Sequence, residues 1–314
     1  MNIRDLIRQA ARQLETAGCD AARVDAEILL MHLCNISRTD LIIKALDEVP
    51  ESIEKGFQSL IKRRANREPI AYITGEKEFW SRPFLVTPDV LIPRPETEHL
   101  IEEVLGRFPD QRDKYTFCDI GTGSGCIAIT LACEYPNAHI VATDISKAAL
   151  AVAGSNAESL GVSDRVTFRH GNMLHALTSG DGPFDAVISN PPYVAIHEME
   201  ELEAELDFEP RGALTDEGNG LQFLEIILNE GVKRLKPAGL IMVETGPCGL
   251  PETPAQLEMK KQIIDLAGHL RGGVYQARES EQLSTESCAP MLTLNRSLPV
   301  ITALIIRLLS FTFR

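Results

Sequence analysis

The segment Phe184-Asp185-Ala186-Val187-Ile188-Ser189-Asn190-Pro191-Pro192-Tyr193 decides how the rest of the chain is interpreted. Its apolar first half predicts a buried strand that ends at Ser189, because the two prolines that follow fix φ and remove backbone donors. Asn190 then lies at the carboxyl end of a strand, which is where open α/β sheets bind their ligands.

The loop after this strand is rich in hydrogen-bond acceptors. Asn190 offers one carbonyl oxygen and one amide group, whereas Pro191 and Pro192 offer only carbonyl oxygens. Such a loop suits a planar –NH2 group, such as a carboxamide or the exocyclic amine of a base, with the Tyr193 ring as a cover. A nitrogen held by two acceptors turns its lone pair toward an electrophile, so the loop predicts transfer to nitrogen. An isolated Asn-Pro-Pro is equally compatible with an ordinary turn, unless a cofactor site lies upstream.

A glycine-rich loop upstream is typical of such a cofactor site. Residues 116–120 form a predicted strand, and a helical run over 126–133 follows. The loop between them consists of Gly121, Thr122, Gly123, Ser124 and Gly125. Alternate glycines let the backbone turn tightly and approach a ligand closely. The GxGxG spacing fits neither the dinucleotide fingerprint nor the phosphate-binding loop, so we expect another nucleotide-type ligand.

Two further strand ends are expected beside this loop. Residues 138–143 form a predicted strand that ends at Asp144, nineteen positions after Gly125. That is close to the spacing of about 20 residues at which an acidic residue binds ribose hydroxyls in wound nucleotide folds. A strand over 166–169 leads to Asn172 and Met173, which we expect beside an adenine ring.

The order of these motifs resembles the class I S-adenosylmethionine-dependent methyltransferases, in the branch that methylates planar nitrogens. More narrowly, the chain resembles the release factor glutamine methyltransferases, the HemK/PrmC family, over roughly residues 1 to 246. Segments 67–75, 91–98 and 209–214 carry this narrower resemblance. It implies methylation of the glutamine in the Gly-Gly-Gln motif of class I peptide chain release factors.

The resemblance also implies how the cofactor is bound. The loop over 121–125 would hold the methionine part of S-adenosylmethionine, with Asn190 nearby. Asp144 would bind the ribose, and Asn172 with Met173 the adenine. The family usually has Asp where this chain has Asn172, so that contact would lack charge assistance.

The same resemblance implies which residues bind the substrate. Asn190 and the Pro191 carbonyl would be the catalytic pair, because they would hold the glutamine amide against the methyl donor for a direct in-line displacement without a metal. Pro192, Tyr193, Arg94 and Glu96 would complete the substrate site. Thr97 would either border the same crevice or cap the following helix.

The implied fold class is α/β, a Rossmann-like methyltransferase domain with a mostly parallel wound sheet, preceded by a small helical bundle. We expect a helical substrate-recognition domain over 1–78, a β-hairpin bridge over 79–92, a methyltransferase domain over 93–275 and an atypical tail over 276–314. Beyond Gly246 the chain departs from the family. There we expect a helix over 256–266, which leaves the closure of the sheet open, and an apolar run over 298–313 that is short of the about 20 residues a membrane helix needs.

Composition limits the classes of partner that the chain can bind. The formal net charge of −14 argues against sequence-independent binding to nucleic acid, which depends on lysine and arginine. Lys62, Arg63, Arg64 and Arg67 form one basic cluster, more simply a solvated helix face than a contact with an acidic partner. The seven cysteines show no paired metal spacing and no signal peptide is evident. We expect a cytoplasmic monomer without stable nucleic-acid or membrane binding, and the resemblance implies class I peptide chain release factors as its partners.

Three alternatives remain open at the level of sequence. Adenine N6 and guanine N2 are also planar amines, so the chain could methylate a nucleic-acid base. The ribosomal protein L3 glutamine methyltransferases keep the Asn-Pro-Pro-Tyr loop, although they usually lack the Arg-Pro-Glu-Thr-Glu run found here over 94–98. A homologue that binds the cofactor without transferring methyl groups is the third.

Overall fold

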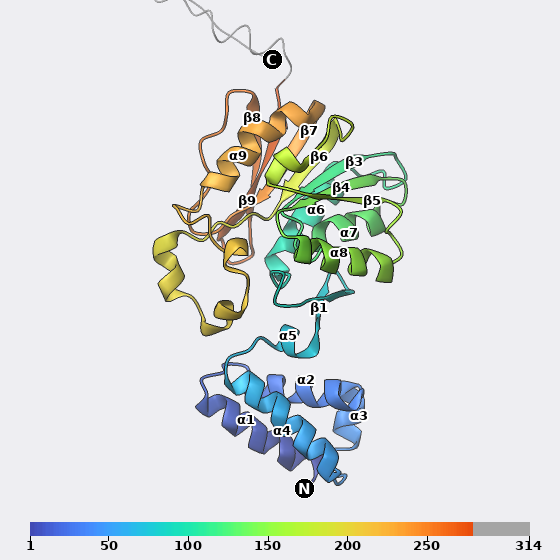
Figure 1. Ribbon diagram of the computed structural model, residues 1–314, viewed down its shortest axis with the longest axis vertical. Helices are drawn as coiled ribbons and strands as arrows, with labels where there is room; N and C mark the ends of the chain where they lie inside the picture. Colours follow the sequence, from blue (N-terminus) through green and yellow to red (C-terminus); the bar gives the residue numbers. More distant parts are fainter. Residues whose placement is uncertain (279–314) are drawn as a thin grey trace, which may run out of the picture. The chain divides into compact units, whose positions relative to one another are not determined.

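The computed structural model describes residues 1–278 (Figure 1), and its N-terminal part is helical. The helices are α1 (Ile3–Thr16), α2 (Ala22–Cys34), α3 (Arg38–Ile43), α4 (Glu51–Ala65) and α5 (Ile70–Thr74). Their apolar faces share one core, in which Leu14, Leu30 and Phe57 are fully buried. The helical bundle predicted for this region is confirmed.

A hairpin follows the helices. Its strands β1 (Glu76–Phe79) and β2 (Arg82–Leu85) are antiparallel and are joined by Trp80 and Ser81. Both joining residues have positive φ, 51° and 56°, which matches the right-handed twist of the two strands. Phe79 and Phe84 pack edge to face in the core of the sheet domain. The hairpin is therefore fixed to that domain, while the domain boundaries given above remain predictions.

The remaining elements build one sheet with helices on both faces. They are η1 (Pro95–Thr97), α6 (Glu98–Arg107), β3 (Thr116–Ile120), α7 (Cys126–Glu134), β4 (His139–Asp144), α8 (Lys147–Ser159), β5 (Val166–His170), η2 (Met173–Ala176), β6 (Phe184–Ser189), η3 (Ile196–Glu201), η4 (Ala204–Phe208), η5 (Arg211–Ala213), α9 (Gln222–Gly231), η6 (Val232–Arg234), β7 (Leu235–Glu244), β8 (Leu257–Ile264) and β9 (Leu270–Ala277). The strand order is β5-β4-β3-β6-β7-β9-β8, with the first five strands parallel and the last two antiparallel. This mostly parallel sheet confirms the predicted fold class.

The apolar strands divide their side chains between two cores, because successive residues of a strand point to opposite faces. On one face Phe117 of β3 packs with α6, α7 and α8. On the other face Cys118 packs with Leu224 and Leu228 of α9 (Figure 1). A parallel sheet covered on both sides in this way leaves its strand ends as the place for a site.

The register places the ends of four strands, β3, β4, β6 and β7, level with one another. Ile120 of β3 lies opposite Thr143 of β4 on one side and Ser189 of β6 on the other. Ser189 in turn lies opposite Val243 of β7. Because these strands are parallel, the residues that follow them emerge along one edge. The connections diverge from β3 toward both sides of the sheet, which makes the gap between β3 and β6 a topological switch point.

The helix predicted over 256–266 is wrong, because this segment is strand β8. Leu257 and Ile263 are buried and most residues between them are exposed. A bulge between Met259 and Lys261 shifts the register and interrupts the alternation that would have indicated a strand. Pairing with β9 outweighs the local helical pattern, so the sheet is completed by two antiparallel strands.

The end of the chain lies outside the described residues from residue 279 onward. The predicted tail over 276–314, apart from its first three residues, and the apolar run over 298–313 therefore stay predictions. Within residues 1–278, every helix is too short or too polar to cross a membrane.

The close approach of β9 to β7 gives a test of the sheet. A Cβ added at Gly272 would lie 2.2 Å from the Val243 carbonyl oxygen, so the backbone must move to accept a side chain. We expect Gly272→Ala to lower the free energy of unfolding by about 2 kcal/mol or more in urea titrations. Gly106→Ala in α6 is the matched control, because no atom lies within 4 Å of its added Cβ. Equal losses in the two variants would contradict this packing.

Candidate active site

The glycine loop after β3 turns in a conformation that favours glycine. Gly121, Gly123 and Gly125 have φ values of +73°, +55° and +84°. A Cβ at Gly125 would lie 2.6 Å from the Cδ1 atom of Ile129, so helix α7 packs directly against the loop. At Gly121 and Gly123 no atom lies within 4 Å of an added Cβ, so their backbone is open to an approaching ligand.

A buried carboxylate supports this loop from below. Asp119 is fully buried, and its Oδ2 atom accepts hydrogen bonds from the Thr122 hydroxyl at 2.6 Å and from the Ala128 backbone N–H at 3.2 Å. Its Oδ1 atom has no partner among the described residues. Burial raises the pKa of Asp119 to about 7, with a further contribution from the charge of Asp144. Asp119 thus holds the loop in shape from inside the sheet.

Asp144 ends β4 beside the same loop. Its Oδ2 atom accepts from the Gly123 backbone N–H at 2.9 Å, and its Oδ1 atom accepts from the Ser146 backbone N–H at 2.8 Å. Each oxygen retains a further acceptor site, which suits the hydroxyls of a ribose. The structure thus places Asp144 directly beside the glycine loop.

The turn after β5 lies next to Asp144. The backbone N–H of Gly171 donates to the Asp144 carbonyl at 3.0 Å. Asn172, which follows, is exposed, and Met173 begins η2 with a φ of +51°. The structure therefore brings the predicted adenine-side pair to the same edge as the predicted ribose ligand.

Asn190 begins the loop after β6, and its amide has a defined direction. Its Nδ2 atom donates to the Thr97 Oγ1 atom at 2.9 Å, which turns its Oδ1 atom away from η1. Within residues 1–278 neither this oxygen nor the Pro191 carbonyl accepts a hydrogen bond. Both acceptors in the sequence-based hypothesis are therefore without a hydrogen-bond partner among the described residues.

The capping role considered for Thr97 is wrong. This side chain makes no capping hydrogen bond to α6, and its backbone is already helical, with φ −64° and ψ −21°. The 3-10 turn η1 runs directly into α6, so Thr97 lies inside a continuous helical path. Its hydroxyl, which is on a residue only 1% exposed, is free to pair with Asn190.

Tyr193 closes the Asn-Pro-Pro-Tyr loop against β7. Its hydroxyl donates to Glu244 Oε1 at 3.0 Å, and a Cβ at Gly246 would lie 2.8 Å from its ring. Burial, the charge of Glu244 and that hydrogen bond raise the pKa of Tyr193. Burial raises the pKa of Glu244 to about 7, opposed by the hydroxyls of Thr97 and Tyr193. Tyr193 is thus held from behind by a buried carboxyl group that is 2% exposed as a residue.

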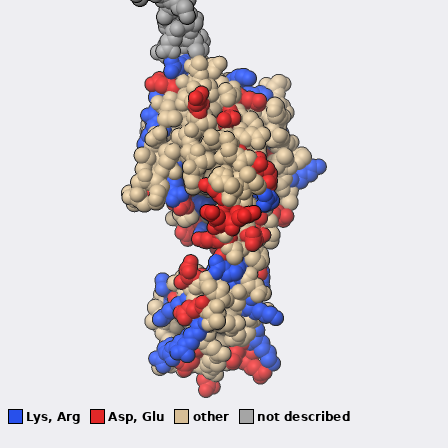
Figure 2. All heavy atoms as spheres, turned by 90° about the vertical axis from the view of Figure 1, so that its left-hand side faces the viewer, with Lys and Arg blue, Asp and Glu red and all other residues tan. Residues whose placement is uncertain are grey.

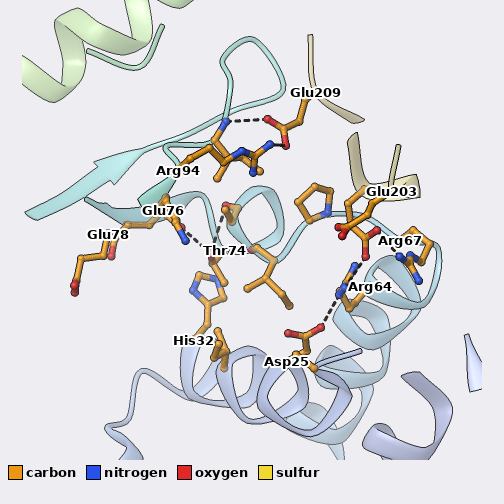
Figure 3. Close-up of a pocket in the computed structure, with 18 of the residues that line it drawn as sticks. Asp25, His32, Arg64, Arg67, Thr74, Glu76, Glu78, Arg94, Glu203 and Glu209 are labelled. Carbon is orange, nitrogen blue, oxygen red and sulfur yellow. Dashed lines mark hydrogen bonds and ion pairs between the residues drawn. The ribbon is translucent and has the colours of Figure 1, made fainter. Parts of the chain in front are cut away.

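Two of the segments that carry the family resemblance meet beside this loop. The Nη2 atom of Arg94 donates to Glu209 Oε1 at 2.5 Å, and Glu209 Oε2 accepts from the Ile92 backbone N–H at 3.0 Å. Figure 3 shows this pair at the rim of a cavity. Glu96 lies 3.6 Å from the Arg271 guanidinium of β9. Arg94, Glu96 and Tyr193 all line the cavity.

This cavity has a volume of about 1390 Å³ and is lined on its other side by helical-bundle residues. Figure 2 shows many acidic side chains gathered on the face that carries the segment between β6 and α9. Arg64, labelled in Figure 3, binds Asp25 and Glu205, each at 2.8 Å, and Arg67 also binds Glu205. The expectation of a solvated basic face is wrong for Arg64, which is only 7% exposed because it lies between these two carboxylates.

The fold, the glycine loop and the acidic strand end are those of an α/β methyltransferase, and comparisons with known proteins agree. The family described as "Methyltransferase domain" matches residues 111–284, more than half of the chain, and the family "PrmC N-terminal domain" matches residues 5–75. A methyltransferase structure from Pyrococcus furiosus is 19% identical, has a TM-score of 0.44, and covers 70% of this chain and 96% of its own.

Two bacterial relatives narrow the class of methyltransferase. A release factor glutamine methyltransferase from Nitratidesulfovibrio vulgaris is 42% identical over 245 residues, which are 78% of this chain and 82% of that protein. Another from Rhodopirellula baltica is 40% identical over 266 residues, or 81% of this chain and 89% of that protein. The chain belongs to the release factor glutamine methyltransferase family.

Two residues at the site, Asp119 and Glu244, were not assigned a role by sequence reasoning, and the pairing of Thr97 with Asn190 was not predicted. Glu244 could have been found, because it follows the apolar run over 240–243 and ends β7 at the edge that also carries Asn190. Asp119 precedes the glycine loop and looked like part of an apolar strand. The pairing of Thr97 with Asn190 spans 93 positions and has no local signal.

The raised pKa values of the two buried carboxyl groups, Asp119 and Glu244, predict how the free energy of unfolding changes with pH. Folded Asp119 keeps its proton up to about pH 7, whereas in the unfolded chain it ionises near its ordinary pKa of 3.8. Raising the pH from about 5 to about 8 must therefore lower the free energy of unfolding, because over most of this range the unfolded chain releases a proton that the folded state retains. We expect Asp119 to lower the free energy of unfolding by on the order of 2 kcal/mol over this range, since a pKa difference of one unit corresponds to about 1.4 kcal/mol.

Thermal or urea unfolding across this pH range checks the prediction. Asp119→Asn cannot ionise, so its stability should fall less steeply with pH than that of the native chain. The contribution of Glu244 has the same sign and persists in this variant. Asp20→Asn on the exposed surface is the control and should keep the native slope. Identical slopes for all three proteins would refute the assignment.

Proposed function

We propose that this chain transfers a methyl group from S-adenosylmethionine to the side-chain nitrogen of the glutamine in the Gly-Gly-Gln motif of class I peptide chain release factors. The observation that supports this most strongly is the register of β3 and β6. Ile120 opposite Ser189 makes Gly121 and Asn190 neighbours at the switch point of the sheet. A donor held by one loop is thereby brought beside an amide held by the next.

The described residues fit this cofactor. The open backbone at Gly121 and Gly123 suits the methionine part, and the Asp144 carboxylate has acceptor sites left for ribose hydroxyls. Asn172 and Met173 would flank the adenine, because the Gly171 N–H ties their turn to β4. The cofactor would supply a methyl group on a positively charged sulfur, which is a strong electrophile without a metal.

The residues of the chain would then position and polarise the substrate amide. Asn190 Oδ1 and the Pro191 carbonyl would each accept one N–H of the glutamine –NH2 group, which points the nitrogen lone pair at the methyl carbon. A new N–C bond forms as the S–C bond breaks, and the nitrogen loses one proton to solvent. Because an amide nitrogen is a poor nucleophile, these two acceptors also favour the charge that develops on it.

The proposal extends to the residues that would bind the release factor around the target glutamine. Arg94, Glu96, Pro192 and Tyr193 would border the bound peptide, and residues 1–78 would contribute to recognition of the release factor. The bound segment would enter the cavity between them. A net charge of −14 supports a protein substrate over a nucleic-acid base. We propose that the enzyme acts as a cytoplasmic monomer.

A methyl-transfer assay tests this function. We expect the full chain with labelled S-adenosylmethionine to add one methyl group to the Gly-Gly-Gln glutamine of a purified release factor, as located by mass spectrometry of the peptide. Asn190→Ala removes one of two acceptors and should reduce kcat by roughly 100-fold or more, in line with the loss of a preorganised polar contact. Asn229→Ala on the exposed side of α9 should match the native chain.

The outcome separates the alternatives. A release factor with alanine in place of the glutamine should remain unlabelled. Label on ribosomal protein L3 or on a nucleic-acid base, with none on the release factor, would overturn the proposed substrate. Cofactor binding measured by calorimetry without transfer to any of these acceptors would indicate an inactive homologue.

A further inference from the structure

A second cavity lies in the helical bundle and has a volume of about 630 Å³. Arg4, Arg8 and Arg12 line it at intervals of four residues, which places them along one face of α1. The rest of its basic lining is Arg23 of α2 and Arg38 of α3. We call this cavity the arginine groove. It is lined by five arginines but only two acidic residues, in a chain whose net charge is −14.

The arginine groove follows α1 for most of its length. The α1 residues that line it run from Ile3 to Glu15, a distance of about 18 Å at the usual rise of 1.5 Å per residue. Ile7 and Leu41 line it as well, and both belong to the buried core of the bundle. A groove about three helical turns long with an apolar floor fits one face of another α-helix.

Exposed apolar side chains lie at one end of this groove. Ile42 lines the groove and is 68% exposed, and Ile43 and Leu46, close to it in sequence, are 76% and 67% exposed. Single exposed apolar side chains are common on protein surfaces, but three within five positions form a patch of the kind that marks an interaction site. The patch and the floor of the groove together offer apolar contact to a partner.

Hydrogen bonds fix the helices around the groove. Helix α3 has only six residues, and a capping box holds its start: the Asp40 backbone N–H donates to Ser37 Oγ at 3.1 Å, and the Ser37 backbone N–H donates to Asp40 Oδ2 at 3.1 Å. The Arg4 backbone N–H donates to the Ala45 carbonyl at 2.9 Å, which ties the first turn of α1 to the residues after α3. A surface that is already formed loses little entropy when it binds.

The positive charges of the groove are incompletely paired. Arg23 and Arg38 share one carboxylate, because both bind Glu27, at 3.0 and 3.4 Å. Within residues 1–278, the exposed side chains of Arg4 and Arg12 make no ion pair or hydrogen bond. Guanidinium groups bind carboxylates through two parallel hydrogen bonds. The groove therefore complements a helix that carries carboxylates along one flank.

The arginine groove and the cavity beside the active site lie on opposite faces of α2. Arg23 and Glu27 line the groove, whereas Asp25, Ile28 and His32 line the other cavity. At 3.6 residues per turn these two sets point in opposite directions, and no described residue lines both cavities. A helix bound in the groove therefore leaves the other cavity open to the substrate.

We propose that the arginine groove binds an amphipathic α-helix of a second partner protein, distinct from the protein that is methylated. The helix carries glutamate or aspartate at every fourth position on one flank, opposite Arg4, Arg8 and Arg12, and places apolar side chains against Leu41 and Ile42. The apolar contacts supply most of the affinity, and the arginines select the partner by charge. This inference does not rest on the proposed function, because the groove is separate from the site of methyl transfer.

The composition of the groove favours a protein helix over nucleic acid. A phosphate backbone would pair with the arginines but would leave the exposed Ile42, Ile43 and Leu46 without apolar contact. The net charge of −14 also disfavours a polyanion. An acidic amphipathic helix satisfies the charged and the apolar parts of the surface together.

Fluorescence anisotropy with the full chain and a labelled synthetic peptide tests the groove. The peptide is a helix of about 18 residues, with leucines along one face and glutamates at every fourth position beside them. We expect it to bind at least about tenfold more tightly than a peptide of the same composition in scrambled order. Added salt should weaken this binding, and a peptide with lysines in place of the glutamates should not bind.

Matched variants locate the binding. Arg4→Glu combined with Arg12→Glu should weaken peptide binding by about tenfold or more, and Ile42→Asp should do so by a similar factor. These side chains are exposed, so the variants should keep the native melting temperature. Arg112→Glu and Leu266→Asp, at exposed positions outside the groove, should bind like the native chain. Equal losses in these controls, or an acidic helix that binds no better than the scrambled peptide, would overturn the proposal.

Competition with the substrate tests whether the partner is a separate protein. Saturating peptide should leave the KM for a purified release factor within about twofold of its native value, and so should the double variant Arg4→Glu with Arg12→Glu. A larger rise in KM in either experiment would make the groove part of the substrate site and overturn a separate partner. If the chain methylates no release factor, the proposed function fails, and peptide binding still decides the role of the groove.

Three further ligands are measured with the same double variant. They are anionic phospholipid vesicles, a single-stranded RNA oligonucleotide and a second copy of this chain, the last detected by sedimentation. Binding of any of these that is lost in the double variant, in a native chain that does not bind the acidic peptide, would overturn the proposed helix as the occupant.

Discussion

The whole site depends on the parallel register at the centre of the sheet. Ile120 lies opposite both Thr143 and Ser189, and Ser189 lies opposite Val243. Since hydrogen-bonded neighbours are about 4.8 Å apart, this register alone puts the glycine loop and the acceptor loop within reach of one small ligand and one amide. A shift by one residue would reverse which side chains enter the two cores, so the packing of apolar strands on both faces maintains the register.

The elements of the site form two groups with different supports. The cofactor side is held by backbone conformation, because Gly125 packs against α7 and Asp144 accepts from the Gly123 N–H. The acceptor side is held by side chains, since Asn190 depends on Thr97 and Tyr193 depends on Glu244. A rigid backbone cradle suits a cofactor that is the same in every turnover. A side-chain network suits an amide whose exact direction controls the reaction.

Much of this arrangement could be predicted from sequence, because the relevant signals are local. The strand that ends in Asn190, the glycine loop and Asp144 each combine an apolar run with a characteristic turn, and parallel strand ends share an edge. Other features depend on contacts distant in sequence. Residues 256–266 carry a helical pattern but pair with β9. Arg64 was predicted to lie on a solvated helix face, whereas Asp25 and Glu205 enclose it in the structure. Thr97 had the position of a helix cap, and only the tertiary fold reveals its pairing with Asn190.

Glu244 and the residue opposite it in β9 are both unusual choices for the interior of a sheet. Gly272 of β9 pairs with Glu244, and a Cβ there would collide with the carbonyl of Val243. Glycine inside a strand weakens the sheet, and an ionisable group in the same row costs additional stability. Two unfavourable choices in adjacent strands are hard to explain by folding alone, because an apolar pair would pack better here. They are consistent with an edge that serves the site beside Tyr193, whose hydroxyl Glu244 accepts, at a cost to the stability of the strands behind it.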